Sequence, residues 1–103
     1  MRQKLNETIR NIANGYRVSK KVLRDNVSFS SDDINYQNPW YMFYRDCEIA
    51  FSKLDDDEKF VISYEYFAPL KSGWWKKFYI KKDFMRISRS AVRKFVRYFY
   101  EIH

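Results

Sequence analysis

The 103-residue chain contains little glycine, proline, cysteine or histidine. Two Gly and two Pro are too few for the many turns of a β-sandwich or for a low-complexity tail. Cys47 is the single cysteine and His103 the single histidine, which excludes an internal disulfide and a Cys/His metal cluster. We therefore expect one ordered, helical domain in the cytoplasm.

Long apolar runs and catalytic motifs are also absent. No stretch approaches the roughly 18 consecutive apolar residues of a membrane span, and no apolar segment follows the first residues, so we expect neither a membrane partner nor a signal peptide. There is no glycine-rich phosphate loop and no nucleophile paired with a base. Asp55, Asp56 and Asp57 precede an apolar helical pattern, which predicts a helix cap rather than a cation site. We expect no enzymatic activity and no cofactor.

Aromatic residues and clustered charges are what the chain has in abundance. It is 46% hydrophobic and 20% aromatic, which is enough for one modest core. Residues 1–25 hold seven basic and two acidic residues (+5), residues 26–70 three and nine (−6), and residues 71–103 ten and two (+8), for a total of +7. A strongly basic end beside an acidic middle predicts a directed surface for a polyanion.

The first 38 residues predict a helical segment followed by a linker. Apolar residues recur at helical spacing over residues 3–13, and the same stripe continues to about Asp25. Asn14-Gly15 is a candidate break within it. Residues 26–38 are rich in Ser, Asn and Asp, whose side chains compete with the helical backbone, so we expect a linker there.

Residues 39–103 read as a series of helices. We therefore expect an all-α fold with a single domain over residues 1–103, in which residues 39–103 form a helix-turn-helix module. Asn38-Pro39 is a strong helix start, with Asn as N-cap and Pro at the first position. The periodicity then predicts a helix ending near Leu54, further helices over 57–67, 74–79 and 81–100, and a turn at 68–73.

The last helix has one basic and one apolar face. With 3.6 residues per turn, five cations form a stripe: Lys82, Arg86, Arg89, Arg93 and Arg97. The opposite side carries Phe84, Ile87, Ala91, Phe95, Phe99 and Ile102. The acidic residues Asp83 and Glu101 fall outside the stripe. Like charges at these spacings repel one another, and a bound polyanion would relieve that repulsion. The apolar face is needed for the core, which disfavours a lipid surface as the partner.

The short segment Trp74–Tyr79 precedes this helix. We expect one Trp to pack against helix 57–67, because aromatic residues are usually buried. Lys76 and Lys77 are candidate phosphate contacts, as is Lys81 at the start of the last helix.

The stretch from Leu54 to Phe99 resembles the C-terminal module of sigma-factor region 4 and the small phage late-transcription regulators of the ArpU type. It also resembles small mycoplasma proteins of this kind. The resemblance is carried by Ala50-Phe51-Ser52-Lys53-Leu54, Asp57-Glu58-Lys59-Phe60-Val61-Ile62, Tyr64-Glu65-Tyr66-Phe67, Trp74-Trp75-Lys76-Lys77-Phe78-Tyr79, Phe84-Met85-Arg86-Ile87 and Ala91-Val92-Arg93-Lys94-Phe95. It implies a transcription regulator that binds double-stranded DNA, with RNA polymerase as a further candidate partner. The turn Ile80-Lys81-Lys82-Asp83 departs from the pattern, which usually has Ser or Thr as the cap.

Two alternatives remain open. If Ser88 is the N-cap of the recognition helix, residues 81–100 split into two helices, but the stripe stays in phase across Ser88 and favours one helix. The functional alternatives are an adaptor that binds proteins and an RNA-binding protein, since a basic helix does not by itself distinguish duplex DNA from structured RNA. The sequence leaves the oligomeric state open.

Overall fold

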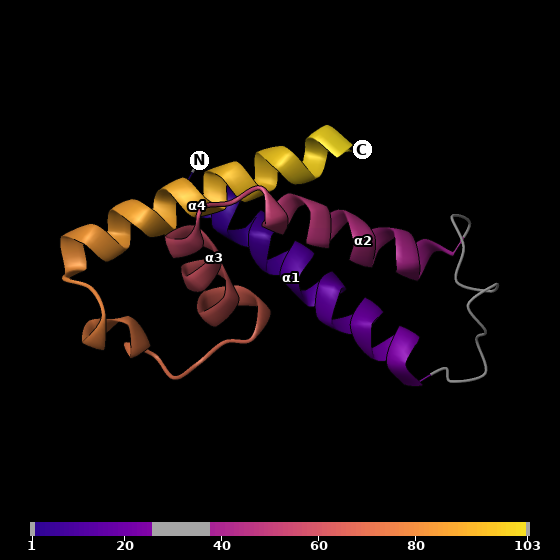
Figure 1. Ribbon diagram of the computed structural model, residues 1–103, viewed down its shortest axis with the longest axis horizontal. Helices are drawn as coiled ribbons and strands as arrows, with labels where there is room; N and C mark the ends of the chain where they lie inside the picture. Colours follow the sequence, from indigo (N-terminus) through magenta and orange to yellow (C-terminus); the bar gives the residue numbers. More distant parts are fainter. Residues whose placement is uncertain (1, 26–37, 103) are drawn as a thin grey trace.

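The computed structural model describes residues 2–25 and 38–102, and over these ranges all the secondary structure is helical (Figure 1). The α-helices are α1 (Arg2–Asp25), α2 (Pro39–Ser52), α3 (Asp56–Ile62) and α4 (Lys81–Ile102). A π-helical turn, η1 (Ser63–Phe67), continues α3, and a 3₁₀ turn, η2 (Trp74–Lys77), precedes α4. Of the predicted linker 26–38, all but Asn38 lies outside the described residues.

The four α-helices share one apolar core. Figure 1 shows α4 along one long edge of the molecule, with α3 beneath its N-terminal half and α2 beneath its C-terminal half. Helix α1 packs against both α2 and α4. The buried cluster comprises Ile9, Ile12, Cys47, Ala50, Leu54, Ile62, Ala91, Val92, Phe95, Val96 and Phe99. No helix in the described ranges combines the length and the apolar character needed to cross a membrane.

Helix α1 is continuous, and the candidate break at Asn14-Gly15 is wrong. The helix runs unbroken to Asp25 because Gly15 faces α2, where the ring of Phe43 occupies the space beside its Cα. Glycine, despite its low helix propensity, therefore allows close packing between two helices here.

The predicted starts of α2 and α3 are confirmed. The Asn38 side chain accepts hydrogen bonds from the backbone N–H of Trp40 (2.9 Å) and Tyr41 (3.2 Å), with Pro39 at the first helical position. Asp55 is the N-cap of α3, and Glu58 completes a capping box by accepting from the Asp55 backbone N–H at 2.9 Å. The acidic run thus ends one helical segment and opens the next.

Helix α4 is one helix across Ser88, as the phase of its stripe predicted, and the alternative with two helices is wrong. Phe84, Ala91, Phe95 and Phe99 are buried as expected, whereas Ile87 and Ile102 are half-buried. The buried arc is also wider than predicted, because Val92 and Val96 belong to it.

Candidate nucleic-acid interface

The outer face of α4 presents the five predicted cations to solvent. Every member of the stripe is exposed: Lys82, Arg86, Arg89, Arg93 and Arg97. At a rise of 1.5 Å per residue, the stripe extends over about 22 Å of helix axis. Lys81 is exposed at the start of the same helix. The fold therefore leaves this whole basic face open, while the opposite face completes the core.

Two members of the stripe have acidic partners on α4 itself. Arg86 lies 3.8 Å from Asp83, and Arg97 Nε donates to Glu101 Oε1 at 3.0 Å. The expectation that both acids fall outside the stripe is therefore incomplete, because a long arginine side chain reaches one turn along its helix. The hydrogen bond to Glu101 raises the pKa of Arg97.

The other three members have no such partner. Within residues 2–25 and 38–102, no carboxylate oxygen lies within 4.0 Å of a side-chain nitrogen of Lys82, Arg89 or Arg93. Arg89 and Arg93 occupy the middle of the stripe, one helical turn apart. No carboxylate in the described ranges therefore competes with an external anion for these two guanidinium groups.

A buried carboxylate holds α4 against α3. The Glu58 side chain is 6% exposed and accepts hydrogen bonds from Ser90 Oγ (2.9 Å) and Lys94 Nζ (3.3 Å) in addition to its capping bond. Lys94 also lies 3.6 Å from Asp55. Burial alone would raise the pKa of Glu58, but the hydrogen bonds from the Asp55 N–H, Ser90 and Lys94 outweigh burial and lower it below its usual 4.5. The network fixes the rotation of α4, so its stripe points outward.

Stacked aromatic rings fix the N-terminal end of α4. The Trp75 ring lies parallel to the Phe84 ring, with centroids 4.5 Å apart, and Trp74 Nε1 donates to Glu65 at 2.6 Å. Trp74 also makes an edge contact with Phe60 at 5.4 Å, which confirms that one Trp packs against the preceding helix. Gly73 opens this turn with a left-handed φ of 79°, a conformation that glycine adopts without strain.

The 3₁₀ turn η2 adds two lysines to the predicted contact residues. Lys76 and Lys77 are exposed, as predicted, and lie in the 3₁₀ turn rather than in a longer helix over 74–79. Phe78 and Ile80, which separate them from α4, are 61% and 66% exposed. All eight predicted contact residues are thus solvent-exposed, in η2 and α4: Lys76, Lys77, Lys81, Lys82, Arg86, Arg89, Arg93 and Arg97.

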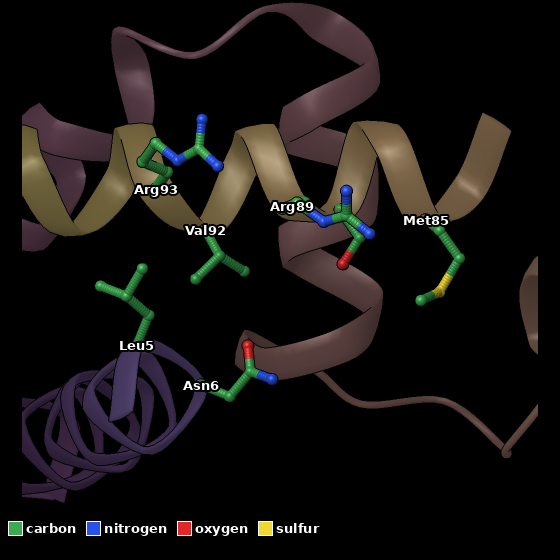
Figure 2. A pocket seen from close by; sticks show the side chains of 7 residues that line it. Leu5, Asn6, Met85, Arg89, Val92 and Arg93 are labelled. Carbon is green, nitrogen blue, oxygen red and sulfur yellow. The ribbon is translucent and has the colours of Figure 1, made fainter. Parts of the chain in front are cut away.

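The two flanks of the stripe differ in chemistry. On the α3 side, Arg86 shares a groove with Asp55, Asp57 and Glu58. On the other side a second groove separates α4 from the first turns of α1 (Figure 2), and Asn6 of α1 lines it. The sequence interpretation missed Asn6, because periodicity does not reveal which helices pack together.

Other potential sites in the chain are weak. In the described part of the chain, no group of three or more His, Cys, Asp or Glu side chains could hold a metal ion. Cys47 is 1% exposed, and burial raises the pKa of its thiol to about 12. The stripe on α4 is therefore the strongest candidate for a functional surface.

Comparison of the chain with models of protein families, with curated proteins and with solved structures found no match in any of the three. The chemistry and geometry of the chain's own residues therefore carry the evidence for its function.

Proposed function

We propose that the protein is a transcription regulator that binds double-stranded DNA through the basic face of α4. The observation that carries the proposal is the pair Arg89 and Arg93: two exposed guanidinium groups, one turn apart, with no carboxylate partner in the described residues. Neighbouring like charges destabilise a helix. A polyanion removes that cost, and the phosphate backbone of DNA is such a polyanion.

The shape of α4 suits the major groove, which admits an α-helix. Arginine can form two parallel hydrogen bonds with a phosphate or with the edge of guanine. We assign Lys82, Arg86 and Arg89, in the first half of α4, to contacts with or near the bases. Arg93 and Arg97, farther along, would position the helix on the backbone.

The preceding segment would act as the support in a helix-turn-helix arrangement. In that arrangement η2 holds α4 through the Trp75–Phe84 stack, and Lys76, Lys77 and Lys81 contact phosphates at the end of the helix. RNA polymerase remains a candidate partner on the resemblance alone.

A lipid surface fits the interface less well. The apolar face of α4 is used in the core through Phe95 and Phe99, so it is not available for insertion between lipids. Duplex DNA takes precedence over structured RNA because of the resemblance, and the experiment separates the two.

The test is a titration of the protein with a mixed-sequence DNA duplex and with a structured RNA at several salt concentrations. We expect the logarithm of the duplex binding constant to fall linearly with the logarithm of the salt concentration, with a slope of about −0.9 for each neutralised phosphate. The triple variant Arg86→Gln/Arg89→Gln/Arg93→Gln should lose about tenfold or more in affinity and have a shallower slope.

A matched variant controls for net charge. Lys20→Gln/Lys21→Gln/Arg24→Gln also removes three exposed cations, from the C-terminal end of α1, and should leave most of the affinity and slope unchanged. Equal losses in both triple variants would show that the interface was placed on the wrong helix. The proposal fails if wild-type protein shows no salt-dependent duplex binding, or if it prefers RNA.

A further inference from the structure

The groove between α1 and α4 has a volume of about 150 Å³. Its lining comprises Leu5, Asn6, Met85, Ser88, Arg89, Val92 and Arg93. In Figure 2, Leu5 of α1 points toward Val92 of α4, and the Asn6 side chain is directed toward α4. Two helices that are far apart in the sequence thus build one small site.

The lining combines positive charge with an apolar floor. Arg89 and Arg93 bring two positive charges, and no residue of the lining is acidic. Asn6 offers an amide donor and Ser88 a hydroxyl donor. The remaining three side chains are apolar. Such a site favours a ligand that has an anionic group next to an apolar one.

We propose that this groove seats one phosphodiester of the DNA backbone, and that α1 is therefore part of the DNA interface. The inference rests on the proposed function. The two guanidinium groups and the Asn6 amide bind the phosphate oxygens, while the adjoining deoxyribose lies against Val92 and Met85. A free inorganic phosphate would leave this apolar floor uncovered, so the backbone phosphodiester fits the lining better.

The charges around the stripe support this position. On its α3 side the groove holds three carboxylates, Asp55, Asp57 and Glu58, against two cations, Arg86 and Lys94, so its formal net charge is −1 and it attracts a phosphate chain less. On its α1 side the groove presents only cations and neutral groups. A DNA strand that lies along α4 is therefore attracted toward α1, where it contacts Asn6.

The experiment changes the charge of Asn6 and compares the result with the same changes at Asn14. Both residues are exposed on α1, about 12 Å apart along its axis, and Asn14 does not line the groove. Asn6→Asp should weaken duplex binding about tenfold at low salt, and Asn6→Lys should strengthen it and steepen the salt slope by about 0.9. Asn14→Asp and Asn14→Lys should change the affinity less than about twofold, with thermal unfolding confirming that all four variants fold.

The outcomes separate this inference from the proposed function. If wild-type protein does not bind the duplex, the proposed function is wrong, and the assignment of a phosphate site to the groove is wrong as well. If it binds, but each Asn6 variant has the same duplex affinity and salt slope as its Asn14 counterpart, the groove does not bind a phosphodiester. The proposed function is then unaffected. Stronger binding by Asn6→Lys cannot result from misfolding. Inorganic phosphate that displaces the duplex more effectively than sodium chloride of equal ionic strength would identify a site for free anions and overturn the assignment.

Discussion

Gly15 of α1 and the ring of Phe43 of α2 are in such close contact that a Cβ on Gly15 would lie 2.8 Å from two carbon atoms of that ring. The ring cannot retreat freely, because it also packs edge-on against Phe99 of α4, with centroids 5.4 Å apart. The lack of a side chain at position 15 therefore sets the distance between α1 and α2.

This contact predicts that Gly15→Ala destabilises the protein, although alanine favours a helix. The substitution gains about 1 kcal/mol in helix propensity, but it overpacks the contact at a cost of about 1–3 kcal/mol. We expect a lower free energy of unfolding in urea. Asn14→Ala, at an exposed neighbouring position, should be neutral or stabilising, and Phe43→Leu should restore part of the loss when combined with Gly15→Ala. A more stable Gly15→Ala protein would mean that Phe43 moves aside without cost.

The carboxylate of Glu58 predicts a pH dependence of stability. Its pKa in the folded protein lies below the usual 4.5, so the folded state favours the ionised form. This contribution is fully present above the unfolded-state pKa and is lost as the pH falls through the lower folded-state pKa. Urea unfolding from pH 7 to pH 3 should therefore show falling stability at the acid end.

The variant Glu58→Gln isolates that contribution. At pH 7 it should lower the free energy of unfolding by about 2 kcal/mol, because it removes charge-assisted hydrogen bonds to Ser90 and Lys94. The difference from wild type should shrink as the pH falls below 4.5. Glu7→Gln, at an exposed position, should follow the wild-type curve. A constant difference across this range would contradict the role assigned to the ionised Glu58.

The thiol of Cys47 should be unreactive in the folded protein. It is buried in the core, and its raised pKa of about 12 leaves almost no thiolate at pH 8. We expect a disulfide reagent to label it at least about 100-fold more slowly in buffer than in concentrated urea, since labelling requires an opening of the fold. Rapid labelling of the native protein would show that the packing between α1 and α2 opens locally.

Removing the acidic partner of Arg97 should strengthen DNA binding. Glu101 accepts a hydrogen bond from Arg97 and adds a negative charge beside the stripe. Glu101→Gln should therefore increase duplex affinity a few-fold at low salt, and less at high salt because of screening. Asp25→Asn makes the same charge change, also removes the acidic partner of an arginine (Arg24), and lies at the C-terminal end of α1 away from the groove, so it serves as the matched control. If Glu101→Gln has the same duplex affinity as the wild type, Arg97 does not contact the DNA.

Local features of the fold were predictable from the sequence because they depend on neighbouring residues. Asn38 caps α2 through backbone groups two and three residues ahead, and Asp55 and Glu58 form their capping box within one turn. The two faces of α4 follow from helical periodicity alone. The five exposed cations of the stripe on α4 were predicted for the same reason.

Features that depend on packing between helices were not predictable. Gly15 looks like a helix break in the sequence, and only the position of Phe43 explains why α1 continues through it. Val92 and Val96 lie outside the predicted apolar stripe but are buried. Val92 faces Leu5 of α1 across the groove, a contact that follows from the arrangement of helices distant in the sequence.

The double role of Glu58 links the stability of two helices. One carboxylate caps the first turn of α3 through the Asp55 N–H and at the same time holds α4 through Ser90 and Lys94. If α4 detaches, Glu58 loses its hydrogen bonds from Ser90 and Lys94. If the first turn of α3 frays, Glu58 is no longer held in place to accept those bonds, and the attachment of α4 weakens. We expect the amide protons of both helices to exchange with solvent as one cooperative unit, so α4 is no more prone to local opening than the core beneath it.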